Sequence, residues 1–186
     1  MRDPRRVAIL ISGRGSNMRA LVEQARNYEV VLVASNKPHA AGLAWARERG
    51  LSTWSKESKG TQKEDYDQAL SAALEEQRVG TIALAGFMRI LSPWFVARWA
   101  GRIVNIHPSL LPKYRGLDTH ARAIAAGDAV SGCSVHIVTE ELDAGEVLGQ
   151  LEVPIERGET AAALEERVLL AEHRLYPAIL NDFVMR

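Results

Sequence analysis

An amide and an imidazole stand two residues apart in the apolar segment Ile103-Val-Asn105-Ile-His107, which Pro108 follows. The apolar residues predict a buried strand over 103–107, and side chains two apart on a strand point to the same side. Asn105 and His107 can therefore act together on one substrate atom. Pro108 keeps the backbone of His107 extended. Since a lone histidine in an apolar strand can also be an ordinary core residue, chemistry here requires further partners.

An acidic loop supplies one such partner. Thr139-Glu140-Glu141-Leu142-Asp143-Ala-Gly145 follows a predicted strand over 133–139. A carboxylate such as Asp143 would pair with His107 and stabilise its imidazolium form. A plain turn at Asp143-Ala-Gly145 is the alternative that composition alone leaves open.

A glycine-rich turn, Gly13-Arg14-Gly15-Ser16-Asn17, separates a predicted strand over 7–11 from a predicted helix that Ser16 or Asn17 would cap. Exposed N–H groups at a helix N-terminus bind anions. Met18 stands where a dinucleotide motif has its third glycine, and Ser35-Asn36 where that motif has an acid. The turn therefore predicts a site for a single phosphate and no NAD. A tight turn without a ligand is the alternative.

Other segments give weaker indications. Met88-Arg89-Ile90-Leu91 follows a predicted strand over 81–85, and it is either an apolar wall for an aromatic ligand or plain packing. The remaining histidines, His39, His120, His136 and His173, show no metal-ligand spacing, so we expect no metal. Cys133 is expected to be a small core residue.

Strands alternate with helices through the first two thirds of the chain, which predicts an α/β fold. We expect a single domain over residues 1–186, with an open, mostly parallel, twisted sheet and helices on both faces. Residues 61–64 predict a capping box, and Ser92-Pro93 predicts the start of a short helix. A last helix is predicted to begin at Thr160 and to end near Pro177.

Composition excludes several classes of protein. The 23 basic and 23 acidic residues balance, which gives no field that would attract nucleic acid or a membrane surface. One cysteine excludes an internal disulfide and fits a reducing compartment. No apolar run approaches the ~20 residues of a membrane span. The chain is therefore expected to be soluble and cytoplasmic. We also expect it to act on small molecules, as a monomer or a homodimer.

Taken together, these segments resemble the phosphoribosylglycinamide formyltransferase family, the folate-dependent enzymes of purine synthesis. The resemblance covers nearly the whole chain. It rests on Ser12-Gly-Arg-Gly-Ser-Asn17, Ala85-Gly-Phe-Met-Arg-Ile-Leu91, Asn105-Ile-His-Pro-Ser-Leu-Leu-Pro112, the Asp143 loop and Glu172-His173. It implies a Rossmann-like formyltransferase fold, 10-formyltetrahydrofolate as co-substrate, and glycinamide ribonucleotide as formyl acceptor.

The resemblance also implies roles for individual residues. Catalysis would fall to Asn105, His107 and Asp143. Glycinamide ribonucleotide would bind at Gly13, Arg14, Gly15, Ser16, Asn17, Met18, Pro108 and Glu172. The folate would bind at Lys63, Met88, Arg89, Ile90, Leu91, Asn105, Thr139, Glu140, Glu141, Leu142 and Asp143.

Three other functions are alternatives that the sequence leaves open. A formyltetrahydrofolate hydrolase shares the same core and would be expected to carry an N-terminal regulatory domain. A methionyl-tRNA formyltransferase would be expected to carry an RNA-binding domain and a basic balance. A non-catalytic phosphosugar- or folate-binding protein would have no need of Asn105, His107 and Asp143 together.

Overall fold

Seven strands and six helices make up the computed structural model, which describes residues 3–186. The strands are β1 (Arg6–Ile11), β2 (Glu29–Ser35), β3 (Thr53–Ser55), β4 (Thr81–Leu84), β5 (Ile103–His107), β6 (Val130–Ile137) and β7 (Val147–Pro154). The helices are α1 (Ser16–Glu23), α2 (Ala41–Glu48), α3 (Lys63–Glu76), α4 (Pro93–Arg98), α5 (Thr119–Ala125) and α6 (Ala161–Phe183).

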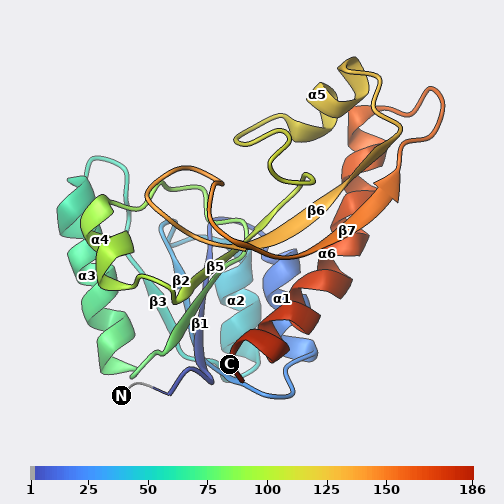
Figure 1. Cartoon of the computed structure of the whole chain (residues 1–186). Helices are drawn as coiled ribbons and strands as arrows, with labels where there is room; N and C mark the ends of the chain where they lie inside the picture. Colours follow the sequence, from blue (N-terminus) through green and yellow to red (C-terminus); the bar gives the residue numbers. More distant parts are fainter. Residues whose placement is uncertain (1–2) are drawn as a thin grey trace.

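The strands form one sheet in the order β3-β2-β1-β4-β5-β6-β7 (Figure 1). The five strands from β3 to β5 pair in parallel, and β6 and β7 extend the sheet with antiparallel pairing. The predicted α/β fold with a mostly parallel sheet is therefore confirmed. The chain leaves β1 toward β2 and later returns to β4 on its other side. In such sheets a ligand crevice forms beyond the carboxyl ends of the two neighbouring strands where the strand order reverses, which here are β1 and β4.

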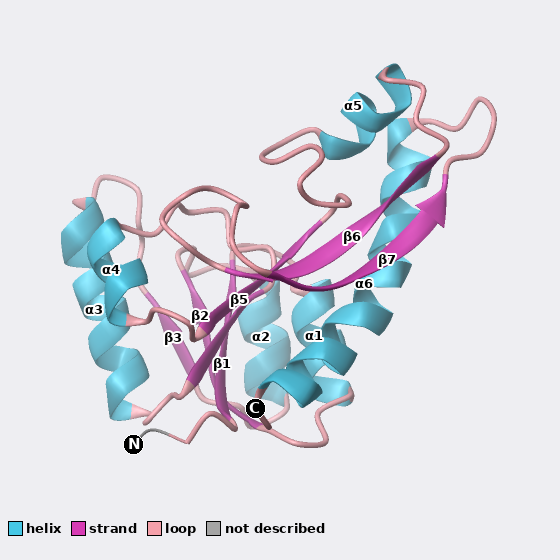
Figure 2. Ribbon diagram, in the orientation of Figure 1, coloured by secondary structure: helices cyan, strands magenta, loops and turns pink. Residues whose placement is uncertain are grey.

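Helices cover both faces of the sheet, with α1, α2 and α6 on one face and α3 and α4 on the other (Figure 2). Alternation along β1 explains the two layers. Val7, Ile9 and Ile11 pack under the first group of helices, whereas Ala8 and Leu10 pack under the second. A strand buried on both faces has to be apolar throughout, as this one is.

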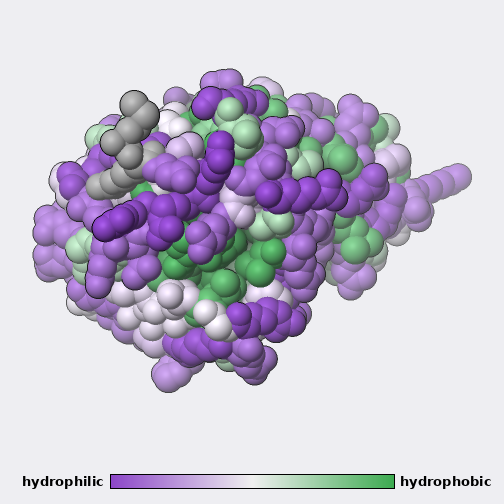
Figure 3. Space-filling model, turned by 90° about the horizontal axis from the view of Figure 1, so that it is seen from below, coloured by the Kyte–Doolittle hydropathy of each residue, from purple (hydrophilic) through white to green (hydrophobic). Residues whose placement is uncertain are grey.

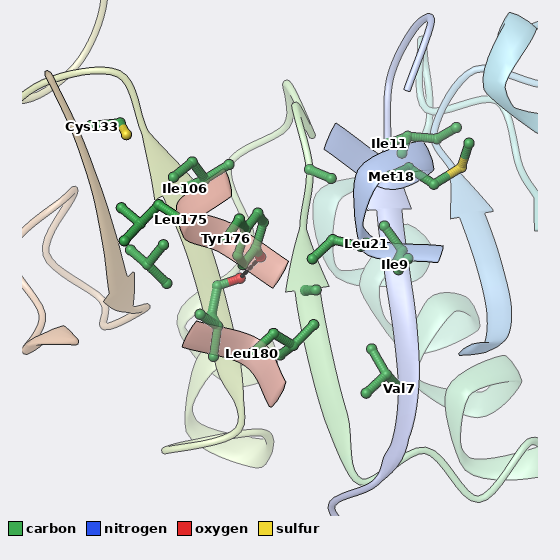
Figure 4. Packing of buried hydrophobic residues seen from close by; sticks show 14 of the residues in the cluster. Val7, Ile9, Ile11, Met18, Leu21, Ile106, Cys133, Leu175, Tyr176 and Leu180 are labelled. Carbon is green, nitrogen blue, oxygen red and sulfur yellow. Dashed lines mark hydrogen bonds between the residues drawn. The ribbon is translucent and has the colours of Figure 1, made fainter. Parts of the chain in front are cut away.

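The hydroxyl of Tyr176 on α6 reaches into the first of these layers. The ring points from α6 toward the sheet (Figure 4), and its one hydroxyl hydrogen is shared between the carbonyl oxygens of Val104, at 2.9 Å, and Leu84, at 3.1 Å. The side chain is fully buried. Its hydroxyl therefore joins the last helix to β4 and β5, the strands that lead into the predicted reaction site.

Two predicted helix starts differ from those observed. The residue before α1 is Gly15, in the left-handed conformation with φ 73°, so Ser16 and Asn17 lie inside the helix and neither caps it. The predicted capping box at 61–64 is also wrong, because α3 follows Gln62 without a side-chain cap and the Thr61 hydroxyl donates to the carbonyl of Glu57. The predicted start at Ser92 is confirmed, since its hydroxyl accepts from the amide of Phe95.

The last helix does not end near Pro177 as predicted but continues to Phe183. A proline inside a helix leaves the carbonyl four residues earlier without its amide donor. Here that carbonyl belongs to His173, and the side-chain amide of Gln24 donates to it at 3.0 Å. A neighbouring helix end thus supplies the missing hydrogen bond, and α6 passes through the proline.

The surface at the end of the molecule that carries the amino ends of the parallel strands is mostly hydrophilic, with a hydrophobic area near its middle (Figure 3). Within residues 3–186, each helix is too short or too polar to span a bilayer. The Leu111–Pro112 peptide bond, whose isomer the sequence left open, is cis.

Candidate active site

Asn105, His107 and Asp143 come together at the carboxyl end of β5. The Nδ1 atom of His107 lies 3.4 Å from one carboxylate oxygen of Asp143, and both side chains are more than 90% buried. The Nε2 atom of His107 lies 2.8 Å from the carbonyl oxygen of Tyr114. Both ring nitrogens therefore face acceptors, an arrangement that a doubly protonated ring satisfies.

His136 belongs to the same cluster, although it was not predicted as a site residue. Its Nε2 atom lies 3.5 Å from the second carboxylate oxygen of Asp143 and 3.2 Å from the side-chain amide of Asn105. Antiparallel pairing sets His136 directly opposite Asn105 on β5. Because that register cannot be read from residue types, the sequence offered no signal for this contact.

The orientation of the Asn105 amide depends on whether the Nε2 atom of His136 carries a proton. The Nδ1 atom of His136 lies 3.0 Å from the carbonyl of Ile137, which can only accept, so Nδ1 carries a proton. A second proton on Nε2 would be donated to Asp143 and would turn the Asn105 oxygen toward the ring. The NH₂ group of Asn105 would then face the pocket as a donor.

Backbone packing holds Asp143 in place. The residue has φ 49°, which asparagine and aspartate tolerate better than most others. Two residues later, a Cβ atom on Gly145 would lie 1.8 Å from the carbonyl oxygen of Ile137, so only glycine lets the loop approach β6. On the other side, the amide of Gly116 donates to Asp143 at 2.9 Å.

The surroundings of Asp143 favour its charged form. Burial acts to raise the pKa of this carboxyl, but the hydrogen bonds from His136 and from the Gly116 amide, together with the nearby His107 ring, outweigh burial and lower the pKa. Asp143 is therefore ionised at neutral pH and can hold a cationic ring beside it.

The cluster lines a cavity of about 1,030 Å³ that runs between α6 and the loops after β4, β5 and β6. Most of the predicted site residues line it: Asn17, Lys63, Met88, Arg89, Ile90, Leu91, Asn105, His107, Pro108, Thr139, Glu140, Leu142, Asp143 and Glu172. This volume is at the upper end of the roughly 300–1,000 Å³ that small-molecule pockets occupy in proteins.

The glycine-rich turn is only partly joined to this cavity. Asn17 lines the cavity, whereas Gly13 and Arg14 line a neighbouring hollow of about 550 Å³. Gly15 on the turn and Ser16 at the start of α1, both partly exposed, line neither space. Met18, predicted to contact substrate, is fully buried in the core, because it lies on the side of α1 that faces the sheet.

At the end of the cavity near α1, Glu172 is 6% exposed and accepts a 2.7 Å hydrogen bond from the side-chain amide of Asn17. Burial, with a smaller contribution from the nearby Glu165, raises the pKa of Glu172 to about 7 against the opposing effect of that hydrogen bond. The oxygen of the Asn17 amide is buried without a hydrogen-bond partner. The pair thus forms a polar end to the cavity that titrates near neutral pH.

His120 also lines this end of the cavity and was not predicted to do so. Burial lowers its pKa, which favours the neutral ring at neutral pH, and its Nδ1 atom has no hydrogen-bond partner. The sequence placed His120 in the helix that follows the long loop, and it gave no indication that this helix would approach α6.

The opposite end of the cavity is apolar. Met88 and Ile90 are 69% and 70% exposed on the loop after β4, and Leu142 is 57% exposed on the Asp143 loop. Large apolar side chains left exposed around a hollow mark a binding surface. Glu141, predicted to lie in this region, does not line the cavity, because its carboxylate pairs with Arg115 at 2.6 Å.

Among residues 3–186, no group of three or more histidine, cysteine, aspartate or glutamate side chains has the geometry to hold a metal ion. The polar atoms of the cluster are arranged as hydrogen-bond donors and acceptors. Such an arrangement can stabilise an oxyanion that develops at the cavity wall.

Comparison with known proteins gives a consistent result. Residues 5–180 match the family described as formyl transferase. The phosphoribosylglycinamide formyltransferase of Escherichia coli K12 is 43% identical over 182 residues, which cover 95% of this chain and 86% of that protein. The trifunctional purine biosynthetic protein adenosine-3 of Homo sapiens is 46% identical over 181 residues. This chain spans only 18% of the length of that larger protein.

Solved structures agree in fold as well as in sequence. The phosphoribosylglycinamide formyltransferase of Brucella melitensis superimposes with a TM-score of 0.92 at 48% identity, covering 98% of this chain and 96% of that one. The protein of the same name from Anaplasma phagocytophilum gives 0.91 at 39% identity, with 97% and 87% covered. The chain therefore belongs to the formyl transferase family, in the group of the phosphoribosylglycinamide formyltransferases.

Proposed function

We propose that this protein transfers the formyl group of 10-formyltetrahydrofolate to the amine of glycinamide ribonucleotide, a step of purine biosynthesis. The observation that carries the proposal is the cluster of Asn105, His107 and Asp143 in the wall of a cavity with one apolar and one polar end. The names of the relatives support the same acceptor. The acting unit is proposed to be the whole of residues 1–186 as one catalytic domain.

The two ends of the cavity suit two substrates. The exposed Met88 and Ile90 would contact the flat ring system of the folate, and Lys63 and Arg89 on the same wall would face its carboxylates. Glu172 would accept a hydrogen bond from the glycinamide amine. The turn at Gly13–Asn17 would hold the phosphate on its backbone amides, with Arg14 beside it.

The reaction is an acyl transfer that needs no covalent enzyme intermediate. The amine nitrogen attacks the formyl carbon, a C–N bond forms, and negative charge develops on the formyl oxygen. The bond from that carbon to N10 then breaks, and a proton passes from the attacking nitrogen to N10. Asn105 and His107 would donate to the oxyanion, a role often worth ~2.7–4 kcal/mol per donor.

Asp143 would have two roles in these steps. Its charge stabilises the cationic His107 ring, and its position beside the reacting atoms lets it assist the proton transfer, directly or through solvent. The carbonyl of Tyr114 accepts from the Nε2 atom of His107 in this conformation. Donation from that nitrogen to the formyl oxygen therefore requires Tyr114 to move away when substrate binds.

One assay tests the proposal. The purified protein is incubated with 10-formyltetrahydrofolate, with and without glycinamide ribonucleotide, and the release of tetrahydrofolate is followed. We expect turnover only with the acceptor present. Formate release without the acceptor would indicate a hydrolase, and binding without turnover in either mixture would indicate a non-catalytic binding protein.

A further inference from the structure

We propose that Asp67, a buried carboxylate on α3 outside the reacting cluster, is a positioning residue that holds Arg89 and the apolar wall for the folate co-substrate. The inference rests on the proposed function, since it assigns the wall at Met88–Leu91 to the folate. Asp67 does not line the cavity, so it would act only through the residues that it holds.

Asp67 contacts the wall segment at two points. One carboxylate oxygen accepts a 2.6 Å hydrogen bond from the backbone amide of Ser92, directly after the wall. The other lies 3.9 Å from the Nε atom of Arg89, inside the wall. The side chain of Asp67 is 0% exposed. A single buried charge thus fixes both the middle and the end of the segment.

Arg89 is held on its other sides as well. Its guanidinium carbon lies 4.5 Å from the centroid of the Tyr66 ring, and its Nη2 atom is 3.5 Å from the carbonyl oxygen of Lys63. Its side chain is only 16% exposed, yet the residue lines the cavity together with Lys63. The ring and the carboxylate therefore leave one edge of the guanidinium to face a ligand.

The wall has one further anchor, on the side of the glycine-rich turn. The hydroxyl of Ser12 accepts a 2.7 Å hydrogen bond from the amide of Met88 and donates to the side-chain oxygen of Asn36. Between the anchors at Ser12 and Asp67, the side chains of Met88 and Ile90 project outward. Leu91 packs into the core layer under α3 and α4, but the exposed Met88 and Ile90 have no such packing, so the polar anchors hold the part of the wall that carries them.

Stability alone does not account for Asp67. The 3.9 Å separation from Arg89 is too long for a hydrogen bond, and neither the nearer oxygen nor the Nε atom has another partner. Buried ion pairs often contribute little to stability, because desolvation of both charges offsets their attraction. Positioning of a ligand-binding arginine gives this pair a function.

The variant Asp67→Asn tests the charge while it keeps the volume and an acceptor for the Ser92 amide. We expect KM for 10-formyltetrahydrofolate to rise about tenfold. KM for glycinamide ribonucleotide and kcat should change less than about twofold, which a general loss of structure would not produce.

Glu159→Gln provides a matched control. Glu159 likewise pairs with an arginine, Arg167 at 2.9 Å, and accepts from a backbone amide, that of Glu156. Its side chain is 4% exposed and does not line the cavity. We expect this variant to lose stability but to keep both KM values.

A double-mutant cycle tests whether Asp67 acts through Arg89. Arg89→Met should raise KM for the folate by itself, and Asp67→Asn should add little in that background. An equal rise in both backgrounds, or an unchanged KM in Asp67→Asn, would overturn the inference. Should Asp67→Asn fail to fold, an unchanged KM in Arg89→Met alone would overturn it too.

Equilibrium binding separates this inference from the proposed function. Tetrahydrofolate is titrated by calorimetry into the wild-type protein and into Asp67→Asn. Weaker binding to the variant supports the inference even if the wild type shows no acceptor-dependent turnover, a result that would reject the proposed function alone. Equal binding to both proteins rejects the inference.

Discussion

Asp143 is the residue at which loss of the charge should affect the reaction far more than the fold. Asp143→Asn keeps the shape but removes the charge beside His107. We expect kcat to fall by ~10²–10⁴. Tetrahydrofolate release is measured with the purified wild type and the purified variant. Circular dichroism compares their folds. Near-wild-type turnover would remove Asp143 from the proposed mechanism.

His136 should affect the same step through Asn105. His136→Phe keeps an aromatic ring but leaves the Asn105 amide without its 3.2 Å partner. We expect kcat to fall by about 10-fold or more, since loss of one oxyanion donor costs ~10²–10³ and misorientation costs part of that. Both KM values should stay close to those of the wild type. A loss confined to KM would contradict this orienting role.

Glu172 makes a pH-dependent contribution to stability. Its pKa is about 7 in the folded protein against an ordinary 4.5, so the folded state favours the neutral form. The contribution is fully present below pH 4.5 and is lost as pH rises through about 7. For a shift of this size the loss is on the order of 3 kcal/mol.

The variant Glu172→Gln should not show this loss. Urea unfolding of both proteins at pH 5 and pH 8 provides the comparison. We expect the wild-type free energy of unfolding to fall more than that of the variant between these pH values. Parallel behaviour of the two proteins would show that the carboxyl is not held in its neutral form.

At the scale of elements, the loop between β6 and β7 positions Asp143, the carboxylate proposed to act in catalysis. Gly145→Ala would place a Cβ atom 1.8 Å from the carbonyl oxygen of Ile137, so the loop would have to move and take Asp143 with it. We expect kcat to fall at least about tenfold, because misplaced catalytic groups cost ~10² for each ångström.

Gly158→Ala is the matched change in a loop away from the cavity. Its added Cβ meets nothing within 4 Å, although φ is 76°, so it introduces backbone strain without a clash. Thermal unfolding should show a small loss of stability and the assay an unchanged kcat. Equal kcat losses in the two glycine variants would mean that the clash at Gly145 has no special effect on Asp143.

The order and type of most elements could be predicted from the sequence, because strands buried on both faces are apolar throughout. Local signals also located Asn105 and His107 on one side of β5. The errors at the end of α6 and at His136 arose where a distant residue decides the outcome. Gln24 lets α6 continue through Pro177, and strand register sets His136 opposite Asn105. No local pattern encodes either contact.

At the scale of the whole molecule, the two core layers share one sheet, since alternate residues of β1 belong to opposite layers. Neither layer can form without the strands that the other also packs against. We therefore predict a single cooperative unfolding transition in calorimetry, with equal calorimetric and van't Hoff enthalpies. Two transitions would contradict the expectation of a single domain over residues 1–186.

The hydrogen bond between Asn17 and Glu172 joins residues 155 positions apart in the sequence. Asn181 on the same last helix binds the backbone of Arg26 and Asn27 over a similar separation. A chain that is still being synthesised therefore lacks the polar end of the cavity until its last helix has left the ribosome and packed against α1. Affinity for the ligand that occupies the polar end should thus appear only after α6 has packed, so that ligand stabilises only molecules in which this helix is in place.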